Sequence, residues 1–89
     1  IDVEGHEYDV VKGLSKKVGT ISFEFTSEFF EESLKCLNYL QKLGYEKFNY
    51  SEGERRKFNT DWVKKEKLVS ILKKELEKNS LLWGDIYTK

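Results

Sequence analysis

The chain has 89 residues, which is enough for one modest domain. Lysine and arginine together number 16, as do aspartate and glutamate, so the net charge is zero and nothing favours general binding to nucleic acid or an anionic membrane. No apolar run approaches the roughly 20 residues of a transmembrane helix, so we expect no membrane partner.

The chain opens on a predicted buried strand over residues 1–4, in which Ile1 and Val3 are β-branched. Gly5 turns the chain into a helix predicted over residues 5–14. Its apolar residues recur at helical spacing at Tyr8, Val11 and Leu14. The chain contains no methionine and begins inside this strand, so we expect it to be the C-terminal part of a longer protein.

A second strand is predicted over residues 20–26, because apolar and polar side chains alternate strictly there. Ser27 is the expected N-cap of a second helix, which Gly44 ends. A third strand follows at residues 45–50. Strands that alternate with helices through short connections indicate parallel pairing.

The last third of the chain begins with a polar loop at residues 51–61. A lysine-rich surface helix is predicted from Trp62 to Lys78, capped by Asn59, Thr60 or Asp61 and ended by Asn79. Its apolar stripe is thin and consists of Leu68, Val69, Leu72 and Leu76. The final strand, at residues 81–88, follows so short a connection that we expect it to run antiparallel at or near an edge of the sheet.

Three motifs follow one another in the first part of the chain. They are Asp2-Val3-Glu4-Gly5-His6-Glu7, then Val10-Val11-Lys12-Gly13-Leu14, then Ile21-Ser22-Phe23-Glu24. In this order they resemble the FkbM family of S-adenosylmethionine-dependent methyltransferases. The family pattern is a strand ending in D-x-E-G-x-E, a helix reading V-L-x-G and a next strand ending in a glutamate. The resemblance covers residues 1–50 well and the remainder loosely.

The resemblance implies an α/β fold, namely the C-terminal half of a Rossmann-like class I methyltransferase domain. Residues 1–89 would then supply strands four to seven of a mixed sheet with helices, in the spatial order 4-5-7-6, with the seventh strand antiparallel. The N-terminal cofactor-binding half would be missing. Neither the glycine-rich loop after strand one nor the acidic residue after strand two is present, so we expect the chain alone to be inactive.

Four residues are candidates for the site. Asp2 and Glu4 face the same side of a strand, where a carboxylate could hold the cofactor's ammonium or act on a substrate hydroxyl. His6, the only histidine, could be the general base, since its ordinary pKa lies near neutrality. Glu24 lies near the carboxyl end of its strand, beside the expected cleft. The resemblance makes Asp2 cofactor-binding and places His6, Glu4 and Glu24 in the catalytic group.

Each candidate also has a structural interpretation. The Asp2–Glu4 pair could be solvated carboxylates that neutralise a helix N-terminus, and His6 could be a surface residue in a first helical turn. Tyr45, Tyr50 and Trp62 could line a substrate pocket, although core packing is the simpler interpretation. One histidine and one cysteine cannot build a zinc site, so no metal is expected.

Two functions are expected. The first, which the resemblance implies, is methyl transfer from S-adenosylmethionine to a hydroxyl of a sugar, polyketide or similar small molecule. The second is a non-catalytic α/β module for protein association, with the lysine-rich third helix as its display face. The single cysteine, Cys36, cannot form an internal disulfide and fits a reducing cytoplasmic location. The strand at residues 1–4 would have an exposed edge, through which a homodimer could form.

Overall fold

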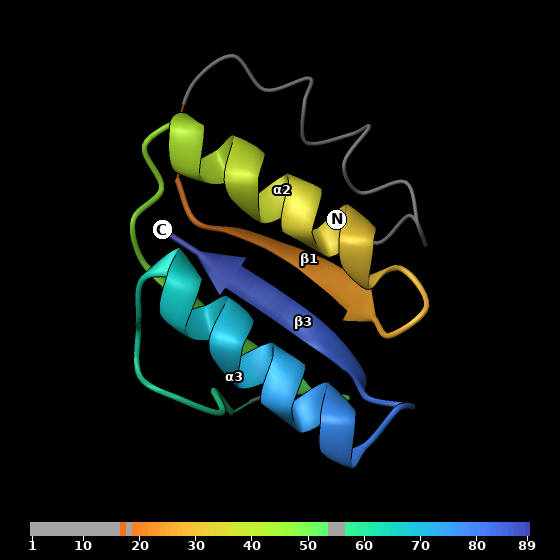
Figure 1. The fold of residues 1–89 in the computed structure, drawn as a ribbon. Coiled ribbons are helices and arrows are strands. Elements are labelled where there is room, and N and C mark those ends of the chain that lie inside the picture. Colours follow the sequence, from red (N-terminus) through yellow and green to blue (C-terminus); the bar gives the residue numbers. More distant parts are fainter. Residues whose placement is uncertain (1–16, 18, 54–56) are drawn as a thin grey trace.

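The computed structural model describes residues 17, 19–53 and 57–89. The elements in these residues are β1 (Ile21–Thr26), α2 (Phe30–Lys42), β2 (Phe48–Glu52), α3 (Lys65–Lys78) and β3 (Trp83–Thr88). The three strands form one sheet in the order β1-β3-β2, and β3 runs antiparallel to both neighbours. Both helices lie over the same face of this sheet, and their axes run in opposite directions (Figure 1).

The alternation of strands and helices indicated parallel pairing, but none of the described strands pair in parallel. β1 and β2 run in the same direction, and β3 lies between them. The last strand runs antiparallel, as expected, and it lies between β1 and β2, next to an edge of the described sheet. The connections along the chain constrain strand direction, whereas the choice of neighbour depends on which faces pack together. The observed order of these three strands agrees with the 5-7-6 part of the order that the resemblance implied.

The described sheet is therefore a three-stranded antiparallel sheet with two helices, and the domain is α/β. The expected strand at residues 1–4 and the expected helix at residues 5–14 lie outside the described residues. The parallel pairing expected between the strand at residues 1–4 and β1 therefore also lies outside the described residues.

The core lies between the sheet and the two helices. Each strand contributes alternate side chains, and each helix contributes the buried part of its apolar stripe. The fully buried aromatic residues are joined by aliphatic residues of both helices and by the thiol of Cys36. The buried set is Phe23, Phe25, Cys36, Leu37, Leu40, Tyr45, Phe48, Tyr50, Leu68, Leu72, Leu82 and Ile86.

The helices begin later than the sequence patterns predicted. Ser27 is not the N-cap of α2: the residue at that position is Phe29, whose N–H donates a 3.2 Å hydrogen bond to Oγ1 of Thr26. The N-cap of α3 is Lys64, with no side-chain cap, rather than Asn59, Thr60 or Asp61. Asn79 ends α3 as predicted.

Tertiary pairing explains the late start of α3. Val63 forms two backbone hydrogen bonds with Phe48, 2.7 and 2.9 Å long, which hold the segment extended along the outer edge of β2. Farther along the same edge, the N–H of Asn59 donates to the carbonyl oxygen of Tyr50 and the Asn59 side chain accepts from the N–H of Glu52. Residues 57–63 therefore follow this edge of the sheet instead of opening the helix.

Candidate functional site

Of the four predicted site residues, only Glu24 lies in the described part of the chain. Asp2, Glu4 and His6 lie outside it. Glu24 is half-buried on β1, and strand alternation directs it to the sheet face opposite Phe23 and Phe25. Because both helices cover the Phe23 side, Glu24 belongs to the second, more polar face of the sheet (Figure 1).

Glu24 stands directly beside Asp85 of β3, and Asp85 in turn pairs with Ser51 of β2. The three residues form a row across the polar face, with Asp85 in its centre. Both acidic residues are half-buried and both have interaction partners within the protein. Like charges directly opposite each other destabilise a sheet, so we expect the pairing of Glu24 with Asp85 to lower the stability of the domain.

Hydroxyl groups lie next to the two carboxylates. Ser51 is 1% exposed, and its Oγ lies 3.4 Å from the hydroxyl oxygen of Tyr87, the next residue of β3 on this face. Asn49, which pairs with Tyr87, donates from Nδ2 to the carbonyl oxygen of Thr60 at 2.8 Å. The polar face thus combines carboxylates and hydroxyls, but Ser51 and Asn49 are almost fully buried and bond within the protein, so their hydrogen bonds stabilise the sheet.

The aromatic candidates divide between the core and the surface. Tyr45 is fully buried and Tyr50 is 3% exposed, so the prediction of core packing is confirmed for both. Burial raises the pKa of the Tyr50 hydroxyl, and the negative charges of Glu75 and Glu52 raise it further. Trp62 is half-buried; the ring of Phe58 lies 5.1 Å from it in an edge-to-face arrangement, and Nζ of Lys89 lies 4.3 Å from its ring centre.

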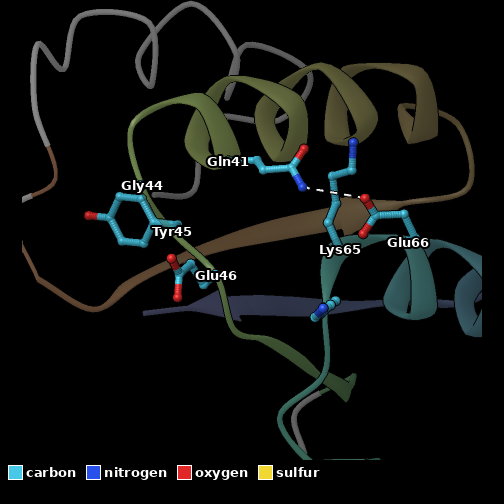
Figure 2. A pocket seen from close by; sticks show the side chains of 7 residues that line it. Gln41, Gly44, Tyr45, Glu46, Lys65 and Glu66 are labelled. Atoms are coloured by element: carbon cyan, nitrogen blue, oxygen red, sulfur yellow. Dashed lines mark hydrogen bonds between the residues drawn. The ribbon is translucent and has the colours of Figure 1, made fainter.

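A hollow of about 520 Å³ opens where the end of α2 meets the start of α3 (Figure 2). Nε2 of Gln41 donates to Oε1 of Glu66 across it at 3.4 Å. Glu66 is stabilised as a carboxylate chiefly by its own backbone N–H and then by Gln41, and both lower its pKa. Lys65 reaches α2, where Nζ donates to Oδ1 of Asn38 at 2.6 Å.

A second groove of about 460 Å³ adjoins the first. The two share Glu46 and Lys64, and both lie at the end of the sheet where β2 begins. The carboxyl ends of β1 and β2 are at the other end, where Thr26 pairs with Trp83 and Glu52 pairs with Gly84. These hollows were not predicted from the sequence, because they depend on how the two helix ends meet.

Asp85, Ser51 and Tyr87 were not predicted from the sequence as residues of this face. A signal was present: residues 83–88 alternate, with Trp83, Asp85 and Tyr87 on one face. That pattern identifies the polar face of β3 but does not identify the strands beside it. The position of Asp85 beside Glu24 therefore follows only from the register of β1 with β3. Cys36 is fully buried, as expected of a structural thiol. No cluster of three or more metal-ligating side chains occurs among the described residues.

Within residues 17, 19–53 and 57–89, neither helix combines the length and the apolar character that crossing a bilayer would require. We compared the chain with protein families, with curated proteins and with solved structures. None of the three comparisons found a match.

Proposed function

We propose that this chain is the C-terminal part of an S-adenosylmethionine-dependent methyltransferase of the FkbM type. The acceptor would be a hydroxyl of a sugar, polyketide or similar small molecule. The observation that carries the proposal is the position of β3, antiparallel and between β1 and β2, in the order that the sequence motifs implied for strands five to seven. β1 contains the third motif, whereas β2 and β3 lie outside all three motifs, so the position of β3 adds support that the motifs do not give.

In this proposal Asp2 faces the cofactor, and His6 removes the proton of the acceptor hydroxyl. Glu4 and Glu24 orient the acceptor. Glu24 is supported by its position on a polar sheet face beside Asp85 and Ser51. The two hollows described above lie at the opposite end of the sheet from Glu24 and are bordered by lysines. The proposal therefore assigns the cofactor to Asp2 and to other parts of the protein rather than to these hollows.

The experiment is to measure S-adenosylmethionine binding and methyl transfer with the complete protein that contains this segment. Calorimetry should detect cofactor binding to the complete protein and none to the 89-residue chain at micromolar ligand. Tight binding by the 89-residue chain would contradict the assignment of the cofactor site to other residues. Absence of binding by the complete protein would contradict the proposal as a whole.

The alternative is a non-catalytic module for protein association. One observation favours it: α3 presents an outward face rich in exposed lysines, at Lys67, Lys73, Lys74 and Lys78. Charged residues on a surface helix are also common without any partner, so this face alone does not define a function. A complete protein that lacks cofactor affinity but binds a partner through α3 would favour the alternative.

A further inference from the structure

The groove of about 460 Å³ is formed where the segment before α3 passes the start of β2. Trp62 and Val63 supply its apolar lining. The reciprocal backbone hydrogen bonds between Val63 and Phe48 hold this lining in place, and Phe58 packs edge-to-face against Trp62. The apolar part of the groove is therefore positioned by contacts within the protein.

Lysines surround this apolar lining. Lys47, Lys64 and Lys67 line the groove, with Glu46 as its acidic member. Nζ of Lys89 also lies 4.3 Å from the centre of the Trp62 ring. The chain as a whole has no net charge, so the positive excess at this groove is a local property and favours an anionic ligand.

The groove continues into the hollow between the helix ends, because Glu46 and Lys64 line both. Figure 2 shows this continuation bounded by Gln41 and Glu66 on one side and by Tyr45 and Glu46 on the other. Lys64 is the N-cap of α3 and provides no side-chain cap, so the positive end of the helix dipole adds to the lysine charges. Together the two hollows make an open depression along the helix ends.

We infer that this depression docks an extended acidic segment of a partner protein. A ring or aliphatic side chain of that segment packs on Trp62 and Val63, while its carboxylates contact Lys47, Lys64 and Lys67. An extended segment fits better than a small molecule because the depression is open, whereas pockets for small molecules enclose most of the ligand surface. The surface lies at the end of the sheet away from the carboxyl ends of β1 and β2, so this inference does not rest on methyl transfer.

The test uses the fluorescence of Trp62. The chain has two tryptophans, so Trp83→Phe leaves Trp62 as its only tryptophan. The probe is the peptide acetyl-Asp-Glu-Phe-Glu-Asp-amide, and the controls replace its Phe by Ala or its acids by amides. We expect a saturable fluorescence change with the probe that weakens as salt is raised, because the contacts are between exposed charges. Both control peptides should bind more weakly.

Charge reversal then locates the site. The double variant Lys64→Glu with Lys67→Glu should bind the probe at least about tenfold more weakly than the parent chain. The double variant Lys73→Glu with Lys74→Glu, on the same helix, should change the affinity for the probe by less than about twofold. All four lysines are exposed, so the paired variants are matched in charge and in exposure. Circular dichroism checks folding, and the milder Lys64→Gln with Lys67→Gln should cause a smaller loss in the same direction.

Three results would overturn the inference. The first is equal loss of binding in the Lys73 and Lys74 variant, which would indicate general attraction between charges. The second is equal affinity for the peptide that lacks Phe, which would exclude docking on Trp62. The third is concentration-dependent self-association that disappears in the Lys64 and Lys67 variant, because the occupant would then be a second copy of this chain.

Discussion

Gly84 on β3 approaches the carbonyl oxygen of Ser51 on β2 so closely that a Cβ atom at residue 84 would overlap it. The contact brings the two strands together next to the polar row, because Asp85 follows Gly84 and pairs with Ser51. Glycine is thus required here by proximity, since a side chain of any size would have to displace the backbone of β2.

Gly84→Ala should destabilise the domain by about 1–3 kcal/mol, the range for overpacking in a close-packed interior. The measurement is the midpoint of urea unfolding, with Ser80→Ala in the exposed turn before β3 as the control. The free energy of unfolding of the control should stay within about 0.5 kcal/mol of that of the parent chain. Equal stability of Gly84→Ala and the parent would mean that β2 and β3 separate at little cost.

The start of α2 offers a paired test of its hydrogen bonding. Thr26→Val keeps the branched shape but removes the Oγ1 that accepts from the N–H of Phe29. We expect the free energy of unfolding to fall by about 0.5–2 kcal/mol, the usual effect of losing a side-chain acceptor at a helix N-terminus. Ser27→Ala, at the residue that the sequence favoured as the cap, should change thermal stability very little. A larger effect at Ser27 than at Thr26 would contradict the observed geometry.

Tyr50 should make stability fall at alkaline pH. Its pKa is raised above the ordinary value of 10.0 by burial first and by Glu75 and Glu52 second. Above that value the unfolded chain releases the phenolic proton while the folded chain keeps it, so rising pH favours unfolding. The contribution is complete below pH 10 and is lost as pH approaches the raised pKa. Unfolding free energies measured across this range should fall less steeply in Tyr50→Phe than in the parent.

The same shift can be observed directly. The difference in phenolate absorbance between the parent and Tyr50→Phe isolates the titration of Tyr50, which should occur above pH 10. Glu75→Gln removes one of the two charges and should move that titration back toward the ordinary pKa. Glu77→Gln, on the exposed side of the same helix, is the matched control and should leave it in place.

The proposed catalytic roles separate in kinetics of the complete protein. His6→Ala should leave cofactor affinity unchanged and slow turnover by about 10²–10⁴-fold if His6 is the general base. Asp2→Asn should mainly weaken cofactor binding, because it removes a charge that faces the cofactor. If Glu4→Gln lowers the melting temperature with little loss of rate, the role of Glu4 is structural. If all three variants keep both affinity and rate, this turn is not the active site.

The sequence determined the elements whose signal is local. Strict alternation placed β1 within one residue of its observed bounds, and the apolar stripe of α3 identified its buried positions at Leu68 and Leu72. These features follow from side-chain periodicity against an apolar interior, which acts on each segment separately. The end of α3 at Asn79 is likewise determined by the local sequence.

Only the tertiary structure decided which segments became neighbours. Val63 pairs with Phe48 and delays α3, and the register of β1 with β3 sets Asp85 beside Glu24. The hollow shared by the helix ends likewise depends on their relative position. Each contact joins residues distant in sequence, so it is set by the joint packing of the whole core rather than by any local pattern. For this reason the class of the domain could be read from the residues, whereas the register of β3 with its two neighbours depends on packing.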